Sequence, residues 1–285
     1  MIRAARSEDQ HALDAFLVSH IDEAMFLVTN LRSHGLAAGR FASGHMNATQ
    51  FWLVGAGIAG VVAVTRRGML MAVLPDGGDL RGLAAAMVGS VISGAVGEAT
   101  AVRKVLAALR LAEKPVRRDA DEPGFAMSLA ELQVPDVTGM RLVPADAGLR
   151  DILVEWRSAY CQELMGAGAD DAGVTAQRDI DAYAAAGSHR VLLWGGRPVA
   201  MTGFNAALQE IVQVGGVFVP PDLRGQGLAR RAVALHLQDA QAQGVARAVL
   251  FAANDAAARA YRAIGFRRKG TMALVLFDAE HRIAA

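Results

Sequence analysis

The feature that most constrains the fold is an internal duplication. When the sequence is shifted by about 140 residues, its two halves match in the same order at four places. The strings VLPDGGDLRGLAAAMV (73–88) and FVPPDLRGQGLARRAV (218–233) both lead from an apolar run through proline into D-L-R-G. The other matches pair 51–62 with 192–201, 97–111 with 254–268, and 125–132 with 270–277. The sequence therefore predicts two copies of one domain, over 1–136 and 137–285, divided at the turn-rich VPDVTG (134–139).

The first copy contains G-x-G-x-x-G at 55–60, a spacing that also occurs in dinucleotide-binding turns. The matching stretch of the second copy has Gly195 and Gly196 between two runs of strand-forming residues, which is typical of a hairpin. Pro198 disfavours the helix that a dinucleotide turn requires. Asp76 favours the opposite interpretation, since a ribose-binding acid is expected about 20 residues beyond such a turn. We predict a hairpin and keep a flavin or nicotinamide oxidoreductase as the third alternative.

The composition restricts the class of protein. Hydrophobic residues make up 53% of the chain, and the net charge of +1 gives no reason to expect a nucleic acid or a membrane surface as partner. The single Cys161 excludes an internal disulfide and a thiolate metal cluster, and the scattered histidines predict no metal site. The polar N-terminus and the short apolar runs predict a cytoplasmic protein, and the Ala- and Gly-rich composition is associated with bacteria.

In the second copy, helical and strand patterns are mixed around what we expect to be one sheet, which indicates an α+β fold. A loop is expected at 166–173. We expect helices at 146–164, 175–186, 227–243 and 254–264, and strands at 140–143, 189–194, 197–206, 209–219, 247–252 and 271–278.

The stretch VFVPPDLRGQGLARRAV (217–233) carries the strongest functional signal. A predicted strand ends at two prolines, a loop with Gly225 and Gly227 follows, and a helix starts at once. Unpaired N–H groups and the helix dipole at such a turn bind pyrophosphate, although an ordinary strand–turn–helix has the same pattern. The Lys and Ser/Thr of a P-loop are missing.

This stretch resembles the acyl-CoA pyrophosphate motif of GCN5-related N-acetyltransferases (GNAT), Q/R-x-x-G-x-G/A, which Arg224, Gly227 and Ala229 fill. NDAAARAYRAIGF (254–266) resembles the second motif of that family. The resemblance covers about 190–277. It implies two tandem GNAT-like domains, each with a mixed, mostly antiparallel sheet flanked by helices, and acetyl-CoA as co-substrate without a metal.

The resemblance also implies a site. The pantetheine arm would pair with a strand ending at Val219, and Tyr261 would protonate the departing thiolate, unless it is only a packed aromatic residue. The implied cofactor-binding residues are Val217, Phe218, Val219, Arg224, Gly225, Gln226, Gly227, Leu228, Ala229, Arg230, Asn254, Ala257 and Tyr261.

The residue that removes the proton of the acceptor amine stays open between Glu210 and Glu163, both of which could be surface acids. The first copy keeps D-L-R-G, but Lys104 and Val105 stand where Tyr261 would map, so we expect a degenerate domain there.

The sequence thus predicts acetyl transfer from acetyl-CoA to a primary amine, on a small-molecule acceptor. The alternatives are transfer of a longer acyl group and a non-catalytic acyl-CoA sensor or scaffold. A homodimer stays open.

Overall fold

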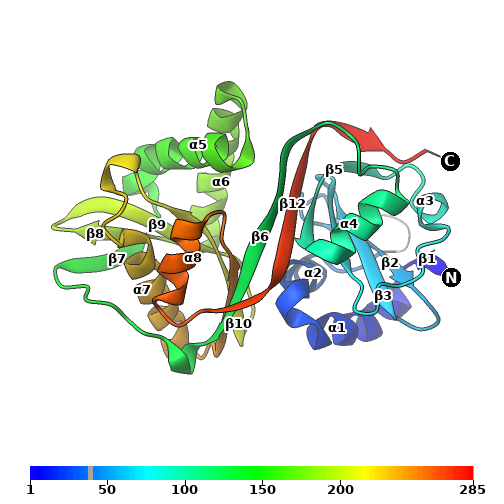
Figure 1. Cartoon of the computed structure of the whole chain (residues 1–285), viewed down its shortest axis with the longest axis horizontal. Helices are drawn as coiled ribbons and strands as arrows, with labels where there is room; N and C mark the ends of the chain where they lie inside the picture. The colour runs from blue at the N-terminus through cyan, green and yellow to red at the C-terminus, as the bar shows by residue number, and fades with distance from the viewer. Residues whose placement is uncertain (38–40, 285) are drawn as a thin grey trace. The chain divides into compact units, whose positions relative to one another are not determined.

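The computed structural model describes residues 1–37 and 41–284 and divides into two compact units (Figure 1). The first unit contains Met1–Glu122 and Gly270–Ala285, and the second contains Pro123–Lys269. Both boundaries differ from the predicted ranges 1–136 and 137–285. The reason is that a strand from the end of each half contributes to the unit that the other half builds.

The two halves have the same order of elements. The first half contains β1 (Ile2–Ala4), α1 (Gln10–Ser19), α2 (Ile21–His34), β2 (Thr49–Val54), β3 (Gly60–Thr65), β4 (Met69–Val73), α3 (Leu83–Ala86), β5 (Val91–Glu98), α4 (Ala99–Ala108) and β6 (Val116–Ser128). The second half contains β7 (Met140–Pro144), α5 (Arg150–Met165), α6 (Ala169–Ala186), β8 (His189–Trp194), β9 (Arg197–Ala207), β10 (Ile211–Phe218), α7 (Leu228–Ala242), β11 (Arg247–Phe251), α8 (Asp255–Arg262) and β12 (Arg267–Arg282). Short 3-10 turns lie at Ser7–Asp9, Leu129–Glu131, Ala147–Leu149 and Pro221–Leu223.

The strand order repeats as well. It is β1-β2-β3-β4-β5-β12 in the first unit and β7-β8-β9-β10-β11-β6 in the second. In each series the fourth and fifth strands pair in parallel and the others pair antiparallel. The predicted mixed, mostly antiparallel α+β fold is confirmed, and the duplication seen in the sequence is a duplication of topology.

The last strand of each half is exchanged. β6 ends the first half, yet it pairs with β11 of the second unit, with Phe125 opposite Leu250. β12 ends the second half, yet it pairs with β5 of the first unit, with Val275 opposite Ala95. Each sheet is therefore completed by a strand from the other repeat.

The G-x-G-x-x-G segment forms a hairpin turn, as predicted. β2 and β3 are antiparallel and Val54 pairs with Gly60, so a strand follows the glycines where a dinucleotide turn needs a helix. In the second unit Gly195 and Gly196 have φ values of 58° and 80°, which is the conformation of the two central residues of a type I′ hairpin. The dinucleotide-binding turn on which the oxidoreductase alternative rested is therefore not formed.

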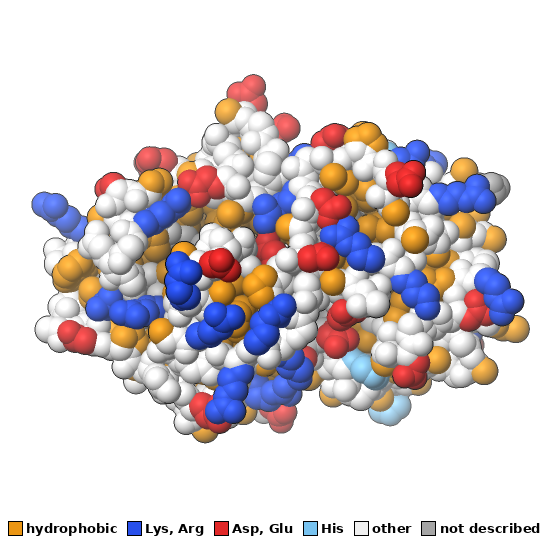
Figure 2. All heavy atoms as spheres, in the orientation of Figure 1, with side chains coloured by type: hydrophobic (Ala, Val, Ile, Leu, Met, Phe, Trp, Pro, Cys, Tyr) orange, Lys and Arg blue, Asp and Glu red, His pale blue; other side chains and the backbone are white. Residues whose placement is uncertain are grey.

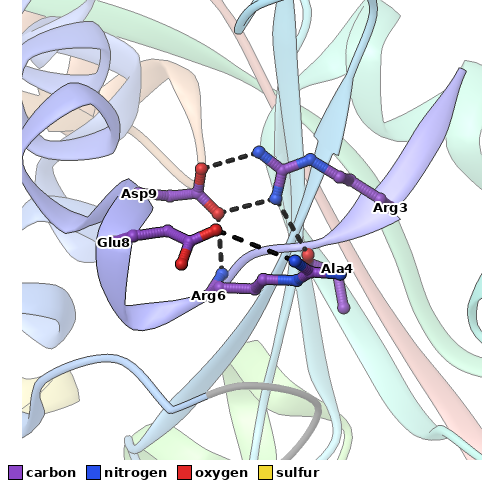
Figure 3. Close-up of polar contacts among 5 residues, drawn as sticks. All are labelled: Arg3, Ala4, Arg6, Glu8 and Asp9. Atoms are coloured by element: carbon purple, nitrogen blue, oxygen red, sulfur yellow. Dashed lines mark hydrogen bonds and ion pairs between the residues drawn. The ribbon is translucent and has the colours of Figure 1, made fainter.

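Polar contacts fix the start of the first unit (Figure 3). Arg3 donates two hydrogen bonds of 2.6 Å to the carboxylate of Asp9, whose Oδ2 also accepts from the Arg6 N–H at 2.7 Å. The hydrogen bond from Arg3 is the main reason why the pKa of Asp9 falls to about 2. The pair ties β1 to the turn that leads into α1.

In the second unit, helices cover both faces of the sheet (Figure 1). Leu153 and Trp156 of α5 and Ile180 of α6 pack on one face. The other face packs against α7 and α8, which contribute Val233 and Tyr261 among others. α6 begins at Ala169, within the expected loop 166–173, so that expectation was wrong. The helix starts early because its first turn carries two aspartates, which favour a helix N-terminus, and because its buried positions begin at residue 172.

Candidate active site

The candidate site begins where β10 and β11 part. Their parallel pairing ends at Gln213, which lies opposite Val249. β10 continues to Phe218 along β9, with a register shift after Gly215, and β11 continues to Phe251 along β6. Beyond Gln213 the facing edges of β10 and β11 are not paired with each other in the described structure. We call this parting of Val214–Phe218 from Leu250–Phe251 the β10–β11 fork; it leaves backbone groups available to an extended ligand.

The glycine loop follows the open end of the fork. Gly225 and Gly227 have φ values of 81° and 72°, which lie in the left-handed region that favours glycine. Gly227 is the N-cap of α7, and its position provides no side-chain cap to the first N–H groups of the helix. Those N–H groups and the helix dipole form an environment that suits an anion.

Two arginines hold this loop in shape. Arg231 donates from Nε to the carbonyl of Asp136 at 2.7 Å and from Nη1 to that of Gln226 at 2.8 Å. Arg224 donates from Nε to the carbonyl of Val219 at 3.0 Å. Its Nη2 lies 2.8 Å from a carboxylate oxygen of Glu163 on α5. Arg224 therefore links the loop to α5, and Glu163 is occupied by an ion pair.

Basic side chains surround the same region. Figure 2 shows blue Lys and Arg side chains gathered over the part of the second unit that Figure 1 labels α7 and α8. Arg230 follows the loop directly, and its Nε has no hydrogen-bond partner in the described structure. The positive charge of Arg230, directly after the glycine loop, attracts phosphate.

The second motif forms α8. Asn254 caps this helix, because its Oδ1 accepts from the Ala257 N–H at 2.9 Å. Tyr261 is 6% exposed and belongs to the apolar cluster that contains Val214 of β10 and Leu250 of β11. Tyr261 therefore shares one apolar cluster with residues of both branches of the fork.

The structure does not bring Glu210 to this place. Glu210 is exposed and precedes Ile211, the first residue of β10, where that strand still pairs with β11. Its carbonyl accepts from the N–H groups of Ala246 and Arg247. The open part of the fork starts four residues further along β10.

The sequence did not single out several polar side chains near the fork. His189, Thr202, Gln213 and His236 are buried, and each has a polar side-chain atom without a hydrogen-bond partner in the described structure. Burial, aided by nearby positive groups, lowers the pKa of both histidines to about 3. Burial likewise raises the pKa of Tyr183, which stacks on His189, to about 12. The available signal was a single polar residue inside an apolar pattern, in a strand for His189, Thr202 and Gln213 and in helix α7 for His236.

In the described residues of the first unit, the loop that matches the glycine loop is built differently. Its helix α3 has four residues, whereas α7 has 15. Lys104 donates to the carbonyls of Gly77 and Gly78 in the matching loop. This loop therefore directs carbonyl oxygens toward a side chain of its own unit, which is unfavourable for a phosphate.

Among the described residues, no group of three or more His, Cys, Asp or Glu could hold a metal ion. No helix in the described part of the chain is long and apolar enough to cross a membrane.

Comparison with known proteins agrees with this geometry. The model of the acetyltransferase (GNAT) family matches residues 151–266. A GCN5-related N-acetyltransferase from Kribbella flavida shares 19% identity, with a TM-score of 0.58 over 92% of this chain and 95% of its own. A tandem GNAT protein from the clavulanic acid biosynthesis pathway shares 13% identity, with a TM-score of 0.56 over 100% of this chain and 99% of its own.

A third structure, the GCN5-related glucosamine N-acetyltransferase region of a fungal β-N-acetylglucosaminidase, shares 14% identity, with a TM-score of 0.57 over 97% of this chain and 38% of its own. No curated protein sequence matches the chain. Identities at this level show a common fold. The family match adds the residues of α5–α8 and of the glycine loop, so the second unit carries a domain of the GNAT acetyltransferase family.

Proposed function

We propose that this chain transfers an acetyl group from acetyl-CoA to a primary amine of a small molecule, and that the second unit alone performs the chemistry. The observation that carries the proposal is the β10–β11 fork, which leads directly into the glycine loop and α7 inside the range matched by the family. A paired sheet would offer no place for an extended arm, and a capped helix would offer no N–H groups to a pyrophosphate.

The residues divide the work along β10. The pyrophosphate is bound by the N–H groups of four consecutive residues, Gln226, Gly227, Leu228 and Ala229. Arg230 adds a positive charge, and its Nε has no hydrogen-bond partner in the described structure. The backbone of Val217–Val219 pairs with the pantetheine arm. Gly225 supplies the left-handed turn, Asn254 and Ala257 hold α8 in place, and Arg224 keeps the loop against α5.

Tyr261 is the proposed acid. Its place in the cluster with Val214 and Leu250 puts it beside both branches of the fork, where a departing thiolate would form. A free phenol has a pKa of about 10 and a thiol about 8.5, so position helps this transfer more than driving force does.

The first unit is proposed to be a degenerate GNAT-like domain without CoA chemistry, because Lys104 engages the carbonyls of its loop. A non-catalytic acyl-CoA sensor is the second candidate. The buried, unpaired polar atoms of His189 and Gln213 beside the fork favour the enzyme, since a sensor needs no acceptor site.

The first test is a calorimetric titration of acetyl-CoA, read for stoichiometry. We expect one site per chain with micromolar affinity. Gly225→Ala and Gly82→Ala form a matched pair, because both glycines end a D-L-R-G string, have φ of 81° and 83°, and leave open space for a Cβ. Only Gly225→Ala should weaken binding. Absence of binding, or equal loss in both variants, contradicts the proposal.

Turnover is then measured as thiol release with four amines: glucosamine, tyramine, spermidine and lysine. Glucosamine is included because a similar structure is a glucosamine N-acetyltransferase region. Acetylation of any one of them supports the enzyme. Tight binding of acetyl-CoA without acetylation in this series favours the sensor.

A further inference from the structure

The face of the sheet that packs against α5 and α6 carries an imidazole in an unusual setting. The ring of His189 stacks on that of Tyr183 with centroids 3.5 Å apart. On the sheet side there is no room beyond glycine. A Cβ added at Gly203 would lie 2.2 Å from the imidazole, and one added at Gly216 would lie 2.6 Å from its Nε2. His189 is thus held between a phenol and the backbone of β9 and β10.

This position is next to the closed end of the fork. His189 lies opposite Gly203 on β9, and Gly203 lies opposite Gly215 on β10. Gly215 is two residues beyond Gln213, where the pairing of β10 with β11 ends. With the pyrophosphate at the glycine loop, an arm lying in the fork brings its far end, the acyl group, toward Gly215 and Gly216.

Unpaired polar atoms surround this point. Nε2 of His189 and both amide atoms of Gln213 have no hydrogen-bond partner in the described structure, although the residues are 1% and 3% exposed. Val212 and Val214 pack in the cluster with α7, so by strand alternation Gln213 faces the side of His189. Buried polar groups are nearly always paired, so these atoms indicate a place for a polar ligand.

Tyr261 lies on the other side. It packs with Val214 in the cluster that includes α7 and α8, whereas His189 stacks on Tyr183 of α6. The two groups therefore approach the fork from opposite faces of the sheet. An incoming amine and a departing thiolate need this separation.

We propose that Nε2 of His189 accepts the proton of the acceptor amine, and that the amine enters from the face covered by α5 and α6. This inference rests on the proposed function. A C–N bond forms as the C–S bond breaks, the amine proton passes to His189, and the thiolate takes the proton of Tyr261. The imidazolium then releases its proton to solvent and the phenolate regains one. In this role the Nδ1–H donates to Ser188 Oγ, 2.9 Å away, which leaves the lone pair on Nε2.

The surroundings of His189 keep its imidazole neutral, so that Nε2 can accept a proton. Burial is the main cause of its low pKa, and the positive charges of Arg157 and Arg190 act in the same direction. A base this weak suffices, because a nitrogen that is forming a bond to a carbonyl carbon is far more acidic than a free ammonium. The carboxylates expected from the sequence do not compete, since Glu163 pairs with Arg224 and Glu210 precedes the paired part of β10.

The test compares His189→Ala and His189→Gln with His236→Gln. His236 is a matched control, because it is also buried and has an unpaired Nδ1. It lies on α7 and stacks on Phe204, so it is not on the face covered by α5 and α6. We expect kcat to fall about 100-fold in both His189 variants, with the Kd for acetyl-CoA unchanged and the His236 variant close to wild type. Added imidazole should restore activity to His189→Ala alone.

The outcomes separate the two proposals. Wild-type protein that acetylates none of the four amines refutes the proposed function and this inference with it. Two results would refute only the role of His189, provided that the wild type is active. One is a His189→Ala variant with the same kcat as His236→Gln, and the other is a His189→Ala variant whose kcat does not rise with added imidazole. Thermal melting of each variant shows whether it folds, and His189→Gln keeps the test decisive if the alanine variant does not.

Discussion

Mild acid should destabilise the second unit through its two buried histidines. His189 and His236 are 1% and 4% exposed, and the pKa of each is lowered to about 3, chiefly by burial. In the unfolded chain a histidine has a pKa of about 6.5. Between these two values the unfolded state binds more protons than the folded state, so the free energy of unfolding falls as the pH falls. This contribution is fully present above pH 6.5 or so and is lost progressively toward pH 3.

The size of the effect follows from this window. Each histidine contributes a slope of about 1.4 kcal/mol per pH unit inside it. From pH 7 to pH 5 this amounts to about 2 kcal/mol for one histidine and about 4 kcal/mol for both. His236→Gln removes one titrating group and should halve the loss. The measurement is urea unfolding at pH 7 and pH 5 in a Trp52→Phe background, followed by the fluorescence of Trp156 and Trp194, both in the second unit.

His11→Gln is the control, since His11 is exposed and lies in the first unit. It should leave the pH dependence of this transition unchanged. An equal loss of stability in His236→Gln and in the wild type between pH 7 and pH 5 would show that His236 does not cause the acid sensitivity. Equal stability of the wild type at the two pH values would show that neither buried histidine has this effect.

Four further substitutions test other parts of the structure. Tyr261→Phe should lower kcat and leave acetyl-CoA binding intact; an unchanged kcat in the thiol-release assay removes Tyr261 from the role of acid. Asn254→Ala removes the cap of α8 and should cost about 1 kcal/mol, measured by urea unfolding; a loss near zero means that the bond to Ala257 contributes nothing. Gly203→Ala places a Cβ 2.2 Å from the imidazole of His189 and should cost about 1–3 kcal/mol, and a neutral effect would show that His189 can move away. Lys104→Met should destabilise the first unit without changing the stoichiometry of acetyl-CoA binding; a second bound acetyl-CoA would contradict the proposed role of the first unit.

Much of the fold could be predicted because the local signals repeat. The hairpin glycines, the strand–loop–helix at 217–233 and the capping asparagine occur in one order, and each has a short-range physical cause. The exchange of β6 and β12 could not be predicted. The strand that contains Phe125 and the strand that contains Val275 would each bury the same apolar residues in either unit. Only long-range pairing distinguishes the two arrangements.

The candidate site divides in the same way. The glycine loop and Tyr261 lie in contiguous motifs, so their spacing could be read directly. The role of His189 could not be predicted from the sequence, because the packing around its ring depends on Tyr183, Gly203 and Gly216, which come from three other elements. The ion pair of Arg224 with Glu163 joins residues 61 positions apart, and no local pattern marks it.

The exchanged strands have a consequence for the origin and handling of this chain. A gene coding for one repeat alone would produce a protein whose last strand is needed by another copy, and two such copies would close into a two-fold symmetric dimer. In a chain that contains both repeats the strand exchange is intramolecular, so its stability does not depend on protein concentration. If the fragments 1–136 and 137–285 are produced separately, each should have an unpaired strand edge. The two fragments should assemble when they are mixed.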